Sequence, residues 1–240
     1  MKLAVLSDIH GNLPALEAVI ADAEGRGCDS FVNLGDSLSG PLWPRETADR
    51  LMALGWPTLA GNHERQLLTT PVERMIPSDS YAIAELAPHH LEWLASLPQT
   101  IAWSDDLFLC HGTPDSDITY FLEDVGEEGA YPASLDAMRK RTGGRPEPMI
   151  LCGHTHIPRV LWLDGQIIAN PGSVGLPAYS DDRPLPHVME TGTPHARYAI
   201  VENGEVDLIE VLYDFVAASE KAREAGRRDW AFALRTGRAQ

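Results

Sequence analysis

The sequence predicts an α/β fold in which two packed β-sheets carry helices on their outer faces. In the first half of the chain, apolar strand-like runs alternate with amphipathic stretches, a pattern typical of right-handed crossovers between parallel strands. The second half consists mostly of strand-like runs and includes a hairpin that turns on Asp164-Gly165. No segment has the composition of a linker, so the 240 residues predict a single domain, 1–240, with a C-terminal helical tail at about 214–240.

The first half is expected to begin with a buried strand at residues 2–6 and a helix at residues 12–27. Asn12 is suited to cap the start of this helix, and Gly25 or Gly27 would end it. The elements expected next are a strand at 30–34, a helix at 44–55 and a strand at 57–60. Residues 63–96 are predicted to be mostly helical, with breaks at Pro71, Pro77 and Pro88.

The second half is expected to be rich in strands. The predicted elements are strands at 99–103 and 106–110, a helix within 129–142, a strand at 147–152 and the hairpin at 159–169. A long loop at 174–197, rich in Pro, Asp and Gly, precedes two more strands at 196–201 and 205–213. A helix is expected from about Asp214 onward.

The charge of the chain excludes some classes of partner. With 19 basic and 35 acidic residues, the net charge is -16, which argues against binding to long nucleic acid or to an anionic membrane. A small phosphorylated substrate remains compatible if metal ions supply positive charge locally. The sequence shows neither a signal peptide nor an apolar run of about 18 residues, and its three cysteines read as buried thiols, so a cytoplasmic location is expected.

Five short polar patterns each follow a strand-like apolar run. They are Asp8-x-His10, Gly35-Asp36, Gly61-Asn62-His63, His111-Gly112 and Gly153-His154-Thr155-His156. Ligands of open α/β sheets bind beyond the carboxyl ends of the strands, so the five patterns can converge at one place. The sequence therefore predicts one polar site built from all five.

The donor atoms in these patterns predict a pair of metal ions. Seven oxygen or nitrogen donors and no sulfur are too many for one tetrahedral zinc ion, but they suit two ions that share a carboxylate. Such a donor set fits manganese, iron, nickel or zinc, and two divalent ions, manganese first, are the expected cofactors. The seven predicted ligands are Asp8, His10, Asp36, Asn62, His111, His154 and His156. His63 lies beside them as a non-ligand that can donate a proton to a leaving oxygen.

The order of the five patterns resembles that of the calcineurin-like metallophosphoesterases, and "NPGSVG" at 170–175 is similar to a loop of their small bacterial phosphodiesterase branch. The resemblance spans residues 3 to about 175, with a similar strand tail to about 212. It implies an αββα sandwich and a dinuclear centre with Asp36 as the bridging ligand and His63 as the acid. It assigns Asp8, His10, Asp36 and His156 to one metal, and Asp36, Asn62, His111 and His154 to the other.

The sequence departs from this family at one motif. Protein Ser/Thr phosphatases of the superfamily read GDxxDRG, whereas this chain reads "GDSLSG". Ser39 and Gly40 therefore replace the Asp that orients the catalytic histidine and the Arg that binds phosphate, which argues against a phosphoprotein phosphatase. The long loop at 174–197 either shapes substrate selection or is a surface insertion.

These observations predict a metal-dependent phosphoesterase. A hydroxide that bridges two divalent ions would attack the phosphorus of a small soluble phosphodiester, and His63 would assist the leaving group. A dinucleoside polyphosphate hydrolase is the enzymatic alternative, and a non-catalytic scaffold with the same fold is a less favoured one. The letters "GDSL" at 35–38 also spell a serine esterase signature, but no base is placed to activate Ser37. His89, His90, His187 and His195 are expected to be structural or surface residues.

Overall fold

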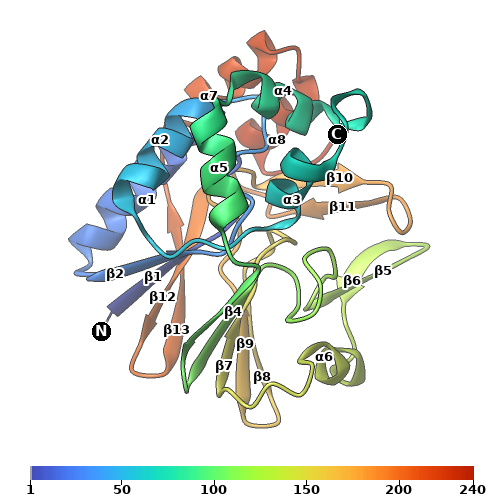
Figure 1. Ribbon diagram of the computed structural model, residues 1–240. Coiled ribbons are helices and arrows are strands. Elements are labelled where there is room, and N and C mark those ends of the chain that lie inside the picture. Colours follow the sequence, from blue (N-terminus) through green and yellow to red (C-terminus); the bar gives the residue numbers. More distant parts are fainter. Residues whose placement is uncertain (1) are drawn as a thin grey trace.

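Two mixed β-sheets pack face to face between layers of helices in the computed structural model, which describes residues 2–240 (Figure 1). In the first sheet the strand order is β13 (Glu205–Val211), β12 (Ala196–Glu202), β1 (Lys2–Leu6) and β2 (Ser30–Asn33). In the second it is β3 (Thr100–Ser104), β4 (Leu107–Cys110), β7 (Met149–Leu151), β9 (Gln166–Asn170) and β8 (Arg159–Leu163). The predicted αββα class of fold is confirmed.

Strand β1 illustrates how the sequence produces these layers. Leu3 and Val5 point into the core between the two sheets, whereas Ala4 and Leu6 point to the opposite face and pack against helix α1 (Leu13–Gly25). Because side chains of a strand alternate between its faces, a continuous apolar run is what a strand buried on both sides requires. β1 pairs in parallel with β2, with Val5 opposite Val32.

Helices cover the outer face of each sheet. α1 and α2 (Pro44–Leu54) lie on the first sheet, followed by α3 (Asn62–Thr69), the short 3₁₀ helix η1 (Val72–Arg74), α4 (Pro77–Glu85) and α5 (Pro88–Ser96). On the second sheet, Met138 of α6 (Leu135–Arg141) packs against Phe108 and Ile150. The helices α7 (Phe215–Glu224) and α8 (Arg228–Thr236) form a C-terminal hairpin behind α4 in Figure 1. None of the helices among residues 2–240 is both long enough and apolar enough to span a lipid bilayer.

One predicted strand, at residues 57–60, is wrong. Only a single parallel bridge forms there, between Asn33 and Thr58. The N–H of Asn33 donates to Pro57 and the N–H of Leu59 donates to Asn33, but the N–H of Ala60 turns away to the carbonyl oxygen of Pro98. The segment leaves the sheet after one residue because the chain must turn into α3.

The sequence reasoning also missed two small hairpins. β5 (Glu123–Gly126) pairs with β6 (Gly129–Pro132), which occupies the start of the range 129–142 in which a helix was predicted. β10 (Ala178–Asp181) pairs with β11 (His187–Glu190) inside the predicted loop at 174–197. Both hairpins lie on the same side of the molecule in Figure 1. The C-terminal tail contains two helices rather than one, separated at Gly226, which has a φ of +78°.

Candidate metal centre

The seven predicted ligands gather at one edge of the two sheets. Asp8 and His10 follow β1, Asp36 follows β2, His111 follows β4, and His154 comes three residues after the end of β7. β1 is parallel to β2 and β4 is parallel to β7, so these strands end in pairs at the same edge. The seven side chains form two neighbouring groups.

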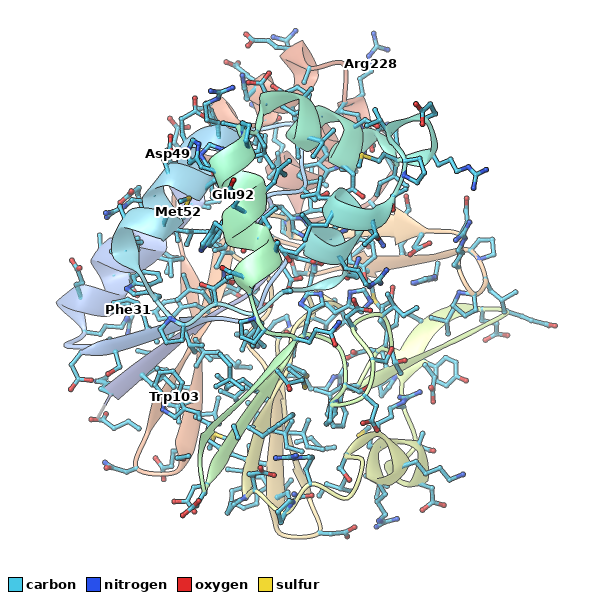
Figure 2. The ribbon with its side chains drawn as sticks, in the orientation of Figure 1. Phe31, Asp49, Met52, Glu92, Trp103 and Arg228 are labelled. Atoms are coloured by element: carbon cyan, nitrogen blue, oxygen red, sulfur yellow. The ribbon has the colours of Figure 1, made fainter. Side chains whose placement is uncertain are left out.

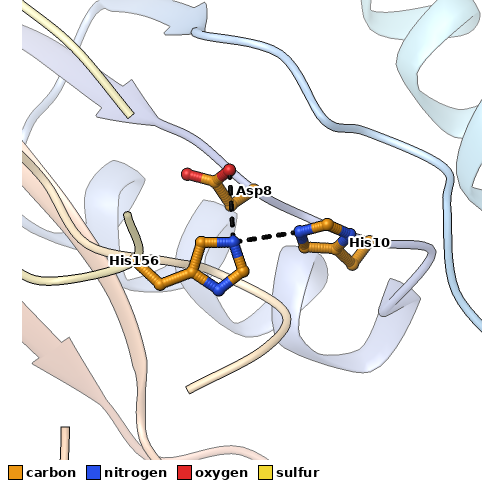
Figure 3. A group of neighbouring side chains, drawn as sticks. All are labelled: Asp8, His10 and His156. Atoms are coloured by element: carbon orange, nitrogen blue, oxygen red, sulfur yellow. Dashed lines mark hydrogen bonds and ion pairs between the residues drawn. The ribbon is translucent and has the colours of Figure 1, made fainter. Parts of the chain in front are cut away.

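The first group consists of Asp8, His10 and His156 (Figure 3). The two Nε2 atoms of the histidines are 3.1 Å apart, and Nε2 of His156 is 3.4 Å from Oδ1 of Asp8. Nδ1 of His10 lies 2.7 Å from the carbonyl oxygen of Ser39, and Nδ1 of His156 lies 2.8 Å from that of Leu176. A carbonyl oxygen only accepts, so both Nδ1 atoms carry the hydrogen, and in the neutral rings both Nε2 lone pairs face each other.

The second group consists of Asp36, His111 and His154, with Asn62 beside them. Nε2 of His111 is 3.0 Å from Oδ2 of Asp36 and 3.1 Å from Oδ1 of Asn62. Nδ1 of His111 donates to the carbonyl oxygen of Leu34 at 2.9 Å, so Nε2 again carries the lone pair of the neutral ring. Three acceptor atoms therefore meet here.

Both groups have the features of divalent cation sites. Lone pairs converge in each, and the buried Oδ1 of Asp8 finds no hydrogen-bond donor among residues 2–240. A cation satisfies such a set of acceptors, and backbone carbonyls that orient the far nitrogen of each histidine are typical supports of metal-ligating imidazoles. Carboxylate, amide and imidazole donors without thiolates suit Mn, Fe, Ni or Zn.

The backbone at these residues is strained. Seven non-glycine residues among 2–240 have positive φ, and five of them are predicted ligands: Asp8, His10, Asp36, His154 and His156. This conformation is unfavourable for side chains with a Cβ and persists where the surrounding structure holds it, typically at functional sites. At Gly61, an added Cβ would collide with Oδ1 of Asp36. The strained loops therefore pack directly on the ligands.

Burial and the neighbouring charges set the protonation of the histidines. Burial lowers the pKa of His10 to about 3, with a further contribution from His156, and it lowers the pKa of His154 to about 4 beside His111. These rings are neutral at physiological pH, which is the form that binds metal. For His63, burial opposes the charge, but the carboxylates of Asp36 and Asp79 raise its pKa to about 9.

His63 lies beside the two groups and has a buried partner that the sequence did not reveal. Its ring is 5.5 Å from the ring of His10, and its side chain is 17% exposed. Nδ1 of His63 is 2.9 Å from Oδ1 of Asp79, in the first turn of α4. His63 therefore has a carboxylate partner in Asp79, although the sequence carries none at Ser39. Neither the residues around Asp79 nor its distance in sequence from the five patterns indicated this contact.

Glu64 is a second residue that the sequence reasoning missed. Its fully buried carboxylate accepts hydrogen bonds from the backbone N–H groups of Asp36, Ser37 and Gly61, each at 2.8 Å. It therefore connects the loop after β2 to the start of α3. The sequence signal that could have identified Glu64 is its position three residues after Gly61, which precedes the first residue of α3. Ser37 is fully buried, with its hydroxyl bonded to Asn33, as expected for a residue that is not a nucleophile.

The hairpin β10–β11 reaches the first group. The ring of Tyr179 lies 4.7 Å from that of His156, and its hydroxyl is 2.9 Å from the hydroxyl of Tyr120. Tyr120 in turn contacts His187 through Nε2 at 2.9 Å. The loop predicted at 174–197 is therefore more than a surface insertion, since it builds an aromatic wall beside one of the predicted ligands.

A pocket of about 250 Å³ lies beside His111. Its other lining residues include Thr100, Thr113, Asp117 and Arg65. Arg65 binds the carboxylate of Asp117 with two hydrogen bonds, from Nε at 2.6 Å and from Nη2 at 3.0 Å. Nη1 of Arg65 makes no hydrogen bond within residues 2–240 and remains a donor for a ligand.

A third cluster of Asp and His side chains lies away from the centre. Asp49, His89 and His90 meet where α2 approaches α5, and Figure 2 shows Asp49 on the outside of the helical layer. Nδ1 of His90 accepts from the N–H of Ala87 at 3.0 Å, so Nε2 carries the hydrogen that it donates to Asp49. The cluster is a surface hydrogen-bond network, and His90 is structural, as predicted.

The sequence of this chain matches a protein family and several known relatives. The sequence model of the "Calcineurin-like phosphoesterase superfamily domain" matches residues 1–193. An uncharacterized protein of Methanocaldococcus jannaschii, MJ0912, is 27% identical over 245 residues, which cover 95% of this chain and 94% of that protein. The phosphodiesterase YfcE of Escherichia coli K12 is 29% identical over 188 residues, covering 74% and 81%.

A solved structure shares the whole fold. The crystal structure of a metallophosphoesterase from Sphaerobacter thermophilus superposes with a TM-score of 0.76 at 28% identity and covers 98% of each chain. The family match covers most of the chain and contains all seven predicted ligands and His63. The chain therefore belongs to the calcineurin-like phosphoesterase superfamily and is a phosphoric ester hydrolase.

Proposed function

We propose that this protein hydrolyses a phosphodiester bond of a small soluble substrate at a dinuclear metal centre. The observation that carries the proposal is the convergence of two sets of side chains with metal-ligand atoms, Asp8–His10–His156 and Asp36–His111–His154, with Asn62 at the second. The sequence relationship to a phosphodiesterase supports the choice of a diester. Asp36 would be the carboxylate that the two ions share.

The two ions, when bound, supply positive charge for the phosphoryl oxygens and a strongly acidified water as nucleophile. The donors contain no thiolate, which suits manganese, iron, nickel or zinc, and manganese is the first candidate to test. The net charge of -16 favours a small substrate over nucleic acid. A cytoplasmic location is part of the proposal.

His63 acts as the acid that protonates the leaving oxygen. Its raised pKa keeps it protonated at neutral pH, and Asp79 holds its Nδ1 so that Nε2 is the atom that gives up the proton. Its partial exposure leaves it accessible to a substrate at the neighbouring ligand groups.

The pocket beside His111 accommodates one ester group of the substrate. Thr100, Thr113 and Arg65 line the pocket, and their hydroxyl and guanidinium groups can bind polar oxygens. The two negative charges of Asp115 and Asp117 exceed the single charge of Arg65. This balance favours a neutral, hydroxylated group over a further phosphate, and hence a diester over a dinucleoside polyphosphate.

The direct test combines metal content with turnover. The protein is purified without chelator, its transition metals are counted by mass spectrometry, and hydrolysis of bis(p-nitrophenyl) phosphate is measured with and without Mn²⁺. About two metals per chain and Mn²⁺-dependent hydrolysis are expected. His63→Ala should retain the metals and lower kcat by ~10²–10⁴-fold on a diester whose leaving alkoxide needs a proton, with a smaller loss on the p-nitrophenyl diester.

The same assay separates the alternatives. Faster hydrolysis of a dinucleoside polyphosphate than of any diester would favour the nucleotide pyrophosphate hydrolase. Two metals without turnover on either substrate would favour a scaffold role. A protein that neither contains metals nor regains them with Mn²⁺ would contradict the proposed centre.

A further inference from the structure

The C-terminal hairpin α7–α8 lies beyond residue 193, where the family match ends. Its helices are nevertheless on the same side of the molecule as α4 and β10 (Figure 1). From its contacts we infer that the hairpin is part of the metal centre: Trp230 and the apolar cluster around it hold the imidazoles of His10 and His156 in their ligand orientation. The inference rests on the proposed metal centre and concerns one of its two groups.

Trp230 of α8 lies directly against His10. The indole is 6% exposed, and its ring centroid is 5.8 Å from that of the imidazole, with the planes at 81°. The same indole covers Gly40, where a Cβ would lie 2.8 Å from Cη2 and 2.9 Å from Cζ3. Gly40 follows Ser39, whose carbonyl oxygen accepts from Nδ1 of His10. The indole therefore packs on the imidazole and on the segment that orients it.

His156 depends on the same cluster through Leu176. The carbonyl oxygen of Leu176 accepts from Nδ1 of His156, and the side chain of Leu176 is buried in the cluster that contains Trp230. The other members of this cluster include Leu42, Ala178, Ala218, Ala222, Ala233 and Leu234. Four of those six belong to α7 or α8, so the hairpin supplies most of the packing behind Leu176.

The second group of ligands has different supports. Nδ1 of His111 donates to Leu34, which lies in the core between the sheets, and Nε2 of His154 is 3.2 Å from the carbonyl oxygen of Ile118. Neither Leu34 nor Ile118 belongs to the cluster around Trp230. A change at Trp230 should therefore weaken metal binding at one group and spare the other.

The indole itself is held from outside. The guanidinium of Arg227 lies 5.6 Å from the centroid of a Trp230 ring, and its Nη1 donates to the hydroxyl of Ser78 at 3.2 Å. Arg228, the next residue, extends outward at the top of Figure 2. The position of Trp230 is thus fixed by α4 as well as by its own hairpin.

The test is metal binding by Trp230→Leu, which removes the aromatic ring but keeps an apolar side chain. Metals per chain are counted after dialysis, and affinity for Mn²⁺ is measured by calorimetry. The expected result is a loss of about one metal per chain and a weakening of that site by ~10–100-fold, as for other residues that orient metal ligands. Trp230→Phe should restore most of the affinity because it restores a ring against His10.

A matched control distinguishes positioning from general stability. Trp56 is stacked on Phe31 with ring centroids 4.4 Å apart, and Figure 2 shows Phe31 far from the hairpin. Trp56→Leu should lower the melting temperature but leave both metals bound. Two metals with wild-type affinity in Trp230→Leu would overturn the inference.

Fluorescence provides a second readout in a conservative variant. Co²⁺ bound beside His10 should quench the emission of Trp230, so wild type should lose fluorescence on titration and Trp230→Phe should lose far less. Equal quenching in the two proteins would contradict the placement. A wild-type chain that binds no metal would refute the metal centre, whereas the other failures would refute only the role of the hairpin.

Discussion

Nδ1 of His63 lies 2.9 Å from Oδ1 of Asp79, and this contact joins helix α3 to helix α4 at the edge of the candidate centre. Asp79 is 2% exposed, and its carboxylate lies in the first turn of α4, where free backbone N–H groups favour negative charge. A buried carboxylate on one ring nitrogen fixes the orientation of the imidazole and leaves the other nitrogen for chemistry. The pair gives Asp79 a positioning role toward His63.

Replacing Asp79 with Asn should lower kcat by roughly 10–100-fold without removing metal, because the ring of His63 loses its charged partner but the ligands stay in place. The loss should increase with the pKa of the leaving group, since a p-nitrophenolate leaves without much help from an acid. Steady-state kinetics on a series of diesters measures this dependence.

The matched control is Asp49→Asn, which also removes the carboxylate from an Asp–His pair but lies on the outside of α2. Its kcat should equal that of wild type on every diester. A loss at Asp79→Asn that is the same for all leaving groups would contradict the positioning role.

The pH dependence should change in the same variant. An acid must be protonated, so kcat should fall as the pH rises through the pKa of His63, which Asp36 and Asp79 raise to about 9 against the effect of burial. Removing the charge of Asp79 lowers that pKa, so the alkaline limb of the kcat profile should move to lower pH. An alkaline limb that does not move would exclude His63 as the titrating group.

Glu64→Gln should destabilise both the fold and the site. One of the two carboxylate oxygens that accept from Asp36, Ser37 and Gly61 becomes an amide nitrogen, which cannot accept. A buried N–H left without its partner costs about 1–3 kcal/mol, which should appear as a lower urea midpoint of the metal-free protein. Glu73→Gln on the exposed η1 is the control and should leave the midpoint unchanged.

Arg65→Gln should raise KM more than it lowers kcat. The side chain borders the pocket beside His111 and has a free Nη1, but it contacts none of the predicted ligands. Loss of a charged hydrogen bond to the substrate corresponds to about 1.5–3 kcal/mol, or roughly 10–100-fold in KM. Arg74→Gln on η1 serves as the control, and a drop confined to kcat would argue against a substrate contact.

The positions of the seven predicted ligands follow from local sequence. Four of the five polar patterns come after an apolar strand, and the paired parallel strands β1–β2 and β4–β7 bring those ends to one edge. Asp8, His10, His154 and His156 lie just beyond two of these strands, in loops where each has a positive φ. For this reason the structure brings together all seven residues that the sequence had selected.

The residues that support those ligands were decided by tertiary packing. Asp79 of α4 contacts His63 of α3, and Trp230 packs on His10, which lies 220 residues earlier in the sequence. Neither Asp79 nor Trp230 belongs to a motif. The hairpin β10–β11 was likewise predicted as a loop, because its short strands are specified by pairing rather than by a strong apolar pattern. Local patterns determine where a strand ends and which ligand follows it. The helix that buries a ligand can come from a distant part of the chain. Its identity depends on how complete helices and sheets pack around a common core, which only the tertiary structure shows.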